Sequence, residues 1–209
     1  MSGRQRSVAG LVLSVAFAAA VTGGQSANPQ VLERLRELGR ASASVNTLRA
    51  HFEQEKRLSI VRDVLRSSGT FLLDKRGRVV WDVAEPDPVR IVITHDGVYA
   101  GGKRVAGGAG GQAAPSPLPM LEGLSGIFAG VSEATAKDFE VTFLAAERLR
   151  LVPRSARLAE WVSGIEITLG GPAQVPVGVR LEEPGGDVTE IAFRDVAVNP
   201  ALDAAAFAP

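Results

Sequence analysis

The chain contains few residues whose types and spacing could form a catalytic centre. Ser125 lies in the sequence Gly-Leu-Ser-Gly, which lacks the second glycine spacing of the turn that presents a nucleophilic serine. The two histidines, His51 and His95, fall on the polar face of a predicted strand and in a predicted turn, and neither has a second ligand at metal-binding spacing. We therefore expect both histidines to be solvated.

Carboxylates are the other candidate catalytic groups. Acidic residues cluster along one stretch of the chain, at Asp74, Asp82, Glu85, Asp87 and Asp96. Paired carboxylates hydrolyse glycosides, but acidic residues at strand ends are usually solvated turn residues. The glycines at 108–111 precede neither a helix nor a Gly-Lys-Ser/Thr, so they predict no phosphate loop. We expect no catalytic residue, no metal and no cofactor, and hence a protein that is not an enzyme.

The stretch from 67 to 94 is the part around which we expect the rest of the chain to fold. It predicts three successive strands, at residues 68–73, 78–83 and 90–94, separated by turn residues. In the middle strand Val79, Trp81 and Val83 share one face, because side chains alternate at a period of two. Such a meander presents a broad apolar surface that something must cover.

The first 27 residues are expected to be a secretory signal peptide. Arg4 and Arg6 precede an apolar run, which is followed by small residues. The whole chain of 209 residues carries 23 Lys and Arg against 23 Asp and Glu, and no cysteine. Loss of the two arginines leaves a slightly negative domain at 28–209, so we expect no nucleic acid partner. The absence of disulfides favours the bacterial periplasm. Without cysteine there is also no lipobox, so we expect a soluble protein, and we expect it to be a monomer.

Two elements follow the signal peptide. Residues 28–40 predict an amphipathic helix with Asn28 as its N-cap and Pro29 at its first position. Residues 45–58 predict a strand, because apolar residues such as Leu48 and Phe52 alternate with charged ones.

A long loop and a second helix divide the chain. Residues 101–119 are rich in glycine and proline, and we predict a flexible loop there. Residues 118–131 predict a weak apolar helix, because Gly123 and Gly126 each cost about 1 kcal/mol relative to alanine. It is either a movable lid or an ordinary core helix. The apolar face of this helix includes Leu121, Leu124, Ile127 and Phe128.

The remainder again predicts strands, at residues 139–144, 148–153, 161–169, 177–183 and 188–193. About ten strands on either side of one loop and helix indicate a mainly β (α+β) protein. We predict a single curved antiparallel sheet that forms an unclosed half-barrel, covered by the N-terminal helix and the lid helix.

The order of these elements resembles the periplasmic outer-membrane lipoprotein carrier family of LolA-like proteins. The resemblance covers nearly the whole of residues 28–209, and the order of short motifs carries it. These motifs are Phe52-Glu53-Gln54, Trp81, Glu85-Pro86-Asp87, Leu149-Arg150-Leu151-Val152-Pro153-Arg154, Gly186-Asp187-Val188-Thr189-Glu190-Ile191-Ala192-Phe193, Asn199 and Phe207.

The resemblance implies an apolar cavity that takes the acyl chains of lipoproteins from an inner-membrane donor and passes them to an outer-membrane acceptor. It implies lipid-binding positions at Leu48, Phe52, Phe71, Val79, Trp81, Val83, Met120 and Leu121, to which the helical pattern adds Leu124 and Phe128. It also implies that a basic residue, here Lys75 with Arg76 beside it, latches the lid. Lysine does not make the forked contacts of arginine, so the latch differs from the family pattern.

Burial of acyl methylenes, at about 0.8 kcal/mol each, lets such a cavity compete with a bilayer. We expect the lid helix to occupy the empty cavity and to swing out on loading. The alternative is a periplasmic sensor or docking module that binds a protein partner on the same scaffold and carries no lipid. The third reading is an enzyme that uses the acidic cluster.

Overall fold

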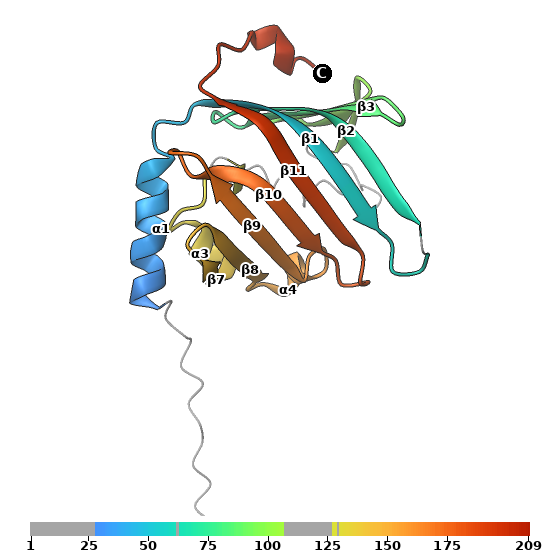
Figure 1. Cartoon of the computed structure of the whole chain (residues 1–209). Coiled ribbons are helices and arrows are strands. Elements are labelled where there is room, and N and C mark those ends of the chain that lie inside the picture. Colours follow the sequence, from blue (N-terminus) through green and yellow to red (C-terminus); the bar gives the residue numbers. More distant parts are fainter. Residues whose placement is uncertain (1–27, 62, 107–126, 129) are drawn as a thin grey trace, which may run out of the picture.

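The computed structural model describes residues 28–61, 63–106, 127, 128 and 130–209, and these form a single open sheet of eleven antiparallel strands (Figure 1). The strands are β1 (Thr47–Arg57), β2 (Val64–Asp74), β3 (Arg78–Glu85), β4 (Val89–Thr94), β5 (Gly97–Ala100), β6 (Lys103–Ala106), β7 (Phe139–Ala145), β8 (Arg148–Pro153), β9 (Gly164–Gly170), β10 (Val175–Glu182) and β11 (Val188–Val198). Their order across the sheet is β6-β5-β4-β3-β2-β1-β11-β10-β9-β8-β7. The predicted single, unclosed antiparallel sheet is confirmed.

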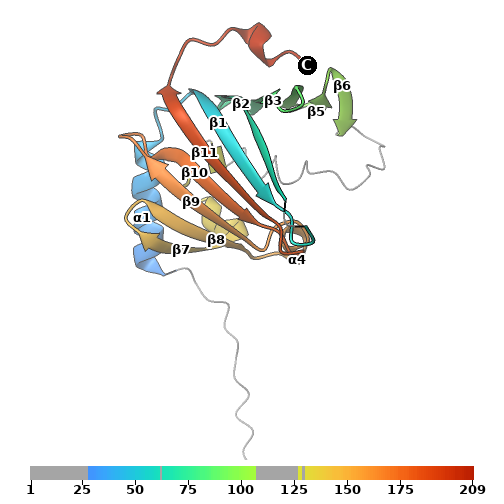
Figure 2. The same cartoon turned by 45° about the vertical axis from the view of Figure 1, so that its right-hand side comes forward.

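The first and last strands meet in the middle of this sheet. β1 pairs with β11 over most of its length, with Phe52 opposite Phe193. Two meanders, β1 to β6 and β7 to β11, are joined by this pair into one curved surface (Figures 1 and 2). β6 and β7 are the two end strands, and in the described residues they do not pair with each other.

The predicted N-terminal helix is confirmed as α1 (Pro29–Ala41). Asn28 caps it, since its side chain accepts a hydrogen bond from the backbone N–H of Gln30 at 2.9 Å. Leu35 and Leu38 are buried, so the apolar stripe of α1 packs against the sheet. The other described helices, α3 (Thr135–Asp138), α4 (Ala156–Ala159) and the 3₁₀ helix η1 (Ala204–Phe207), are single turns.

One predicted loop boundary is wrong. Residues 103–106, which we expected to lie in a flexible loop, form β6. Gly101 and Gly102 have φ angles of 55° and 75°, which glycine adopts at little cost, and the chain turns there to pair with β5. The rest of the predicted loop and most of the predicted lid helix lie outside the described residues, and residues 127 and 128 are helical.

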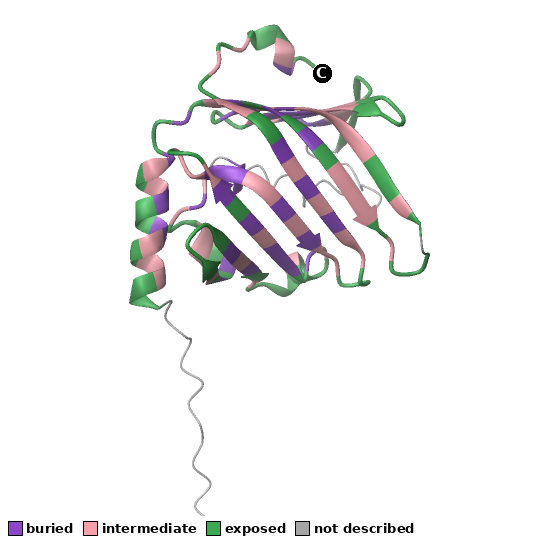
Figure 3. Cartoon of the chain, viewed as in Figure 1, coloured by how far each residue is buried: buried purple, intermediate pink, exposed green. Residues whose placement is uncertain are grey.

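The sheet buries side chains on both faces. Its inner face, which we define as the face carrying Phe52 and Trp81, holds the main hydrophobic core. Burial alternates along β1, β9 and β11, as expected for strands with one face inward (Figure 3). On the outer face a smaller cluster forms where Phe207 of η1 covers Val80 and Val92. Among the described helices, none combines the length and the hydrophobicity needed to cross a membrane.

Candidate functional site

Five aromatic rings meet on the inner face of the sheet. We call Phe52, Phe71, Trp81, Phe128 and Phe193 the aromatic cluster. Its ring centroids lie 4.5 Å apart for Phe52 and Trp81, 5.4 Å for Phe71 and Trp81, and 4.7 Å for Phe71 and Phe128. None of the five residues is more than 7% exposed. Aromatic pairs at these spacings gain about 0.5–1.5 kcal/mol beyond the burial of their surface.

Strand register brings four of these rings together. Phe71 lies opposite Trp81 and Phe52 lies opposite Phe193, so β3, β2, β1 and β11 each contribute one ring. The partner of Phe52 on β2 is Gly69. A Cβ atom at Gly69 would lie 2.0 Å from the carbonyl oxygen of Asp82 and 3.0 Å from the Phe52 ring. Glycine at this position therefore allows β3 and the Phe52 ring to approach the backbone of β2.

The predicted lipid-binding residues that the structure describes all lie in this inner core. Leu48, Phe52, Phe71, Val79, Trp81 and Phe128 are buried, and Val83 is half-buried against them. Met120, Leu121 and Leu124 lie outside the described residues. Their role in binding lipid stays a prediction.

Sequence reasoning missed Phe193. Its strand was predicted, and Phe193 alternates with Ile191 on one face of it, but only the pairing of β11 with β1 brings its ring to within 5.2 Å of Phe128. The alternation of apolar residues along this strand was the only sequence signal for Phe193, and alternation does not show which strand lies beside it.

Phe128 is the only member of the aromatic cluster that does not come from the sheet. The residues that follow Phe128 pack closely against the C-terminal half of α1 and the residue after it. A Cβ atom at Gly130, where φ is 125°, would lie 2.4 Å from Oγ of Ser42. A Cβ atom at Gly39 would lie 3.2 Å from Cβ of Ser132. Phe128 is thus a plug on the inner face, held by a segment that rests on α1.

The predicted latch residues are in the turn between β2 and β3. The Lys75 ammonium donates a hydrogen bond to the carbonyl oxygen of Ser42 at 3.0 Å. Ser42 is the residue against which Gly130 packs, so Lys75 contacts the end of α1 where the segment after Phe128 is held. Arg76 instead donates to the buried carboxylate of Asp74. A direct contact with the lid stays a prediction, because residues 107–126 lie outside the described part.

The residues considered for catalysis are not assembled into a catalytic arrangement in the described part of the chain. His51 and His95 are exposed, as expected. Asp74 is bonded to two arginines and Asp82 pairs with Arg90 at 2.8 Å. Among the described residues, no three His, Cys, Asp or Glu side chains are grouped closely enough to hold a metal ion. Ser125 lies outside these residues.

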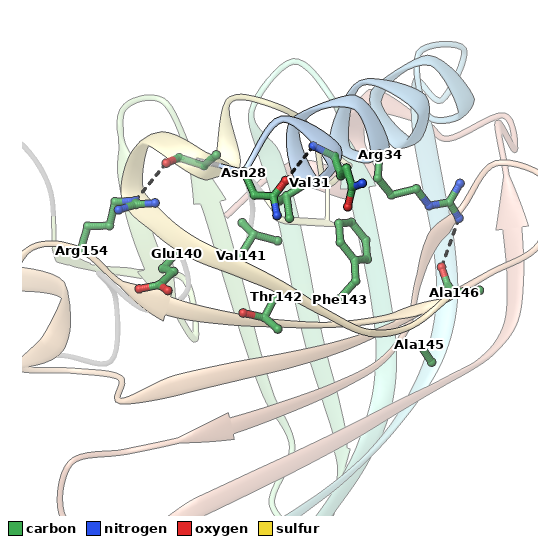
Figure 4. Close-up of a pocket in the computed structure, with 12 residues that line it drawn as sticks. Asn28, Val31, Arg34, Glu140, Val141, Thr142, Phe143, Ala145, Ala146 and Arg154 are labelled. Atoms are coloured by element: carbon green, nitrogen blue, oxygen red, sulfur yellow. Dashed lines mark hydrogen bonds between the residues drawn. The ribbon is translucent and has the colours of Figure 1, made fainter. Parts of the chain in front are cut away.

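A groove lies between α1 and the end strand β7, and Figure 4 shows the residues that line it. We call it the α1–β7 groove; its volume is about 730 Å³. Val31 of α1 and Val141 and Phe143 of β7 form its apolar middle, and Arg154 and Arg34 lie towards its two ends (Figure 4). The guanidinium of Arg34 donates to the carbonyl oxygen of Ala146 at 3.1 Å, and that of Arg154 donates to the carbonyl oxygens of Ala136 and Phe139.

A second pocket, of about 940 Å³, is lined by β1, β2, β11 and the residues Glu85 and Pro86. It includes Gln54, Ser67 and Ile191. These follow or precede Phe52, Gly69 and Phe193 by two positions, so they share the inner face with the aromatic cluster. This part of the inner face is therefore more polar than the cluster itself.

Solved structures that are similar to the chain at low sequence identity include proteins from three organisms. A LolA superfamily protein from Nitrosomonas europaea is 10% identical, with 86% of this chain and 96% of that chain covered and a TM-score of 0.47. The lipoprotein LppX from Mycobacterium tuberculosis is 7% identical, with 85% and 99% covered and a TM-score of 0.44. A chain of the MucA/MucB complex from Pseudomonas aeruginosa is 14% identical, with a TM-score of 0.43; 85% of this chain is covered, and the match spans 59% of that chain.

No curated protein matches the sequence. Residues 43–107 match the family model "Outer membrane lipoprotein carrier protein LolA". These residues run from the start of β1 through β6, the stretch that contains Phe52, Phe71 and Trp81. The resemblance to LolA-like proteins is confirmed.

Proposed function

We propose that this chain is a periplasmic carrier that binds the acyl chains of a lipoprotein or another lipid on its inner face and transfers them between the inner and outer membranes. Residues 1–27 are the signal peptide in this proposal, and residues 28–209 are the lipid-binding domain, which acts as a monomer and not as an enzyme. An inner-membrane donor loads it and an outer-membrane acceptor unloads it.

The position of Phe128 carries the proposal. An apolar surface made by four strands is covered by a side chain from outside the sheet, on a segment that packs against α1 through small residues. Side chains of the strands themselves cannot leave the surface without breaking the sheet. A plug on a separate segment can leave, and hydrocarbon is the class of ligand that replaces an aromatic ring at no cost in hydrogen bonds.

Truncation of the plug tests this function. Full burial of a Phe side chain is worth about 1.5–3 kcal/mol, and a guest that must displace it binds more weakly by that amount. We expect Phe128→Ala to bind a dansylated undecanoic acid at least ~10-fold more tightly than the unaltered protein, since 1.4 kcal/mol is a factor of ten. Fluorescence titration measures this affinity.

Phe207→Ala is the matched control. Phe128 and Phe207 are both 3% exposed, but Phe207 covers the small cluster on the outer face. We expect Phe207→Ala to lower the stability of the fold and to leave the affinity for the fatty acid unchanged. If Phe128→Ala binds no fatty acid, or if the two variants change its affinity equally, the inner face is not the acyl site.

The docking module on the same scaffold is the second candidate function. The α1–β7 groove favours it, because backbone N–H and C=O groups of β7 that face the groove have no strand partner among the described residues.

A further inference from the structure

In the part of the chain that the structure describes, the outer edge of β7 has no neighbouring strand, and the acyl-carrier proposal leaves this edge unexplained. In an antiparallel sheet, alternate residues of a strand bond to the neighbours on its two sides. The N–H of Leu169 in β9 donates to the carbonyl oxygen of Glu147 at 2.7 Å, just before β8 begins. Leu149 and Leu151 of β8, which lie two and four positions further along, therefore also bond to β9.

The remaining residues of β8 bond to β7. Arg150 and Val152 lie opposite Thr142 and Glu140, and these pairs exchange the hydrogen bonds of the β7–β8 ladder. Val141 lies between Glu140 and Thr142, and Phe143 follows Thr142. The backbone N–H and C=O groups of Val141 and Phe143 are therefore directed away from β8. β8 is the only strand that pairs with β7 among the described residues. The outward groups of Val141 and Phe143 therefore lie along the α1–β7 groove, which both residues line.

Arginine side chains bond to the two ends of this edge, and within the described ranges no hydrogen bond to its middle residues Val141 and Phe143 is found outside the β7–β8 ladder. The guanidinium of Arg154 donates to the carbonyl oxygen of Phe139 at 3.1 Å. Arg34 donates to the carbonyl oxygen of Ala146. The groove follows the chain from Glu140 to Ala146. This length corresponds to about seven extended residues at about 3.4 Å each.

The side chains of β7 protect its edge less than those of β6 protect the other end of the sheet. Natural end strands carry charges, prolines or short lengths that prevent another strand from pairing with them. β6, at the other end of the sheet, begins with Lys103 and Arg104 and has four residues. β7 has seven residues, of which Glu140 is the only charged one. Its main irregularity is a register shift between Phe143 and Ala145.

We propose that the α1–β7 groove binds an extended segment of a partner protein, which adds to β7 as a twelfth strand. Backbone hydrogen bonds from Val141 and Phe143 hold the segment, and alternate apolar side chains enter the middle of the groove beside Val31. Acidic side chains at the two ends of the segment face Arg34 and Arg154. This site is separate from the acyl site of the carrier proposal and does not depend on it.

The outward backbone N–H and C=O groups of β7 make a hydrocarbon chain an unfavourable ligand for the α1–β7 groove. A hydrocarbon chain that covers a backbone N–H or C=O without replacing its hydrogen bond costs about 1–3 kcal/mol for each group. A peptide supplies an acceptor for each N–H and a donor for each C=O at the normal interstrand distance of about 4.8 Å. The groove therefore favours binding of an extended peptide over binding of an acyl chain.

Hydrogen exchange of the free protein is the first test. We expect the amides of Val141 and Phe143 to exchange at least 100-fold faster than those of Glu140 and Thr142, which the β7–β8 ladder protects. NMR-detected exchange measures all four amides. Equal protection of the four amides would overturn the proposal, because the edge of β7 would then be closed.

Peptide binding is the second test. The probe is a heptapeptide with blocked ends, with Asp at each end and alternating Val and Thr between them. We expect it to bind with a Kd below 1 mM and to slow exchange of Val141 and Phe143 at least 10-fold. Absence of binding at millimolar peptide, or protection at other amides only, would overturn the proposal. So would the same protection produced by undecanoic acid and not by the peptide.

Two N-methylated peptides give a matched control on the unaltered protein. One carries N-methyl groups on its odd residues and the other on its even residues. In a strand, one set of N–H groups faces β7 and the other faces away. We expect one peptide to lose at least 10-fold in affinity and the other to stay within about 3-fold of the parent. Equal behaviour of the two peptides would contradict strand addition.

A protein variant tests the same hydrogen bond from the other side. Val141→Pro removes an outward N–H and keeps the ladder to β8, because proline is tolerated on the open side of an end strand. We expect it to weaken peptide binding at least 10-fold, whereas Val141→Ala, which keeps the N–H, binds more tightly than the proline variant. Thermal unfolding of both variants checks that they fold. If Val141→Pro does not fold, the two N-methylated peptides still test whether the peptide adds to β7 as a strand.

Discussion

Asp74 is the one fully buried charged residue among those the structure describes, at 2% exposure. It lies at the end of β2, where the guanidinium and backbone N–H of Arg76 donate to its carboxylate and Arg78 adds a further contact. The hydrogen bond from Arg76, followed by that from Arg78, holds the pKa of Asp74 far below its ordinary value of 3.8. This carboxylate fixes the turn that carries Lys75 towards Ser42.

Replacement of Asp74 tests this role at the residue scale. A depressed pKa means that the carboxylate stabilises the fold above its ordinary pKa and that this stabilisation is lost as the pH falls below about 3.8. We expect Asp74→Asn to lower the free energy of unfolding by about 1–3 kcal/mol at pH 7. The difference from the unaltered protein should narrow at pH 3.

Urea denaturation at the two pH values measures this difference. Asp87→Asn is the control, since Asp87 is an exposed turn residue, and we expect it to be neutral at both values. An Asp74→Asn variant as stable as the unaltered protein at pH 7 would show that the arginines stabilise the turn without their partner.

At the scale of elements, α1 together with residues 127, 128 and 130–133 acts as one cover for the inner face. Gly39 and Gly130 bring the two segments into close contact, and Arg36 pairs with Glu133 at 2.8 Å. Phe128 is connected to α1 through this contact. If the plug leaves when lipid enters, the contact must open or α1 must move with it.

A disulfide between the two segments distinguishes these possibilities. Gly39→Cys with Ser132→Cys places two Cβ atoms 3.2 Å apart, a few tenths of an ångström below the usual range for a disulfide. The chain has no other cysteine that could interfere. We expect the oxidised variant to lose uptake of dansylated undecanoic acid and the reduced variant to recover it.

The single cysteine variants are the controls for this experiment, and oxidation should leave their uptake unchanged. Equal uptake by the oxidised and reduced double variant would show that the segment need not separate from α1.

Across the whole molecule, one row of charged residues spans six strands on the outer face. Register places each member opposite the next, and the row is Arg66, Glu55, Glu190, Arg180, Glu166 and Arg150. The signs alternate except where Glu55 lies opposite Glu190, in the β1–β11 pair that joins the two meanders. Arg57 donates to both carboxylates there, at 2.9 Å and 2.7 Å, and so replaces repulsion by attraction.

Loss of Arg57 should therefore weaken the junction of the two meanders. We expect Arg57→Gln to lower the free energy of unfolding at low salt and pH 7, because like charges would then lie directly opposite each other. The hydrogen bond from Arg57 lowers the pKa of Glu190, so its contribution is present at neutral pH and is lost as acid protonates the carboxylate. High salt should also reduce the effect.

Urea denaturation at low and high salt measures this prediction. Arg194→Gln is the matched control, since Arg194 also joins β11 to β1 through Glu53, but Glu53 lies opposite Ala192 and not opposite another carboxylate. We expect a smaller loss for this control, and equal losses for the two variants would contradict the proposed effect of the facing carboxylates.

The sequence by itself determined the elements and the direction of their side chains. The cap at Asn28, the stripe of α1, the alternation in β1 and β3 and the turn glycines act within a few residues of each other, so periodicity and turn chemistry predict them. For this reason Leu48 and Phe52 of β1, and Val79 and Trp81 of β3, were predicted on the apolar faces of their strands, and all four side chains are buried.

Only the tertiary structure decided which elements are neighbours. The β1–β11 pair, the ring of Phe193, the contact of Lys75 with Ser42 and the α1–β7 groove all join segments that are distant in sequence or separated by another element. Alternation states which face a side chain takes, but it does not state which strand lies beside it. Strand register and the crossing of helix over sheet depend on the packing of the whole core. That packing brings Phe128 to the other rings of the aromatic cluster and, among the described residues, leaves β7 with a strand on one side only.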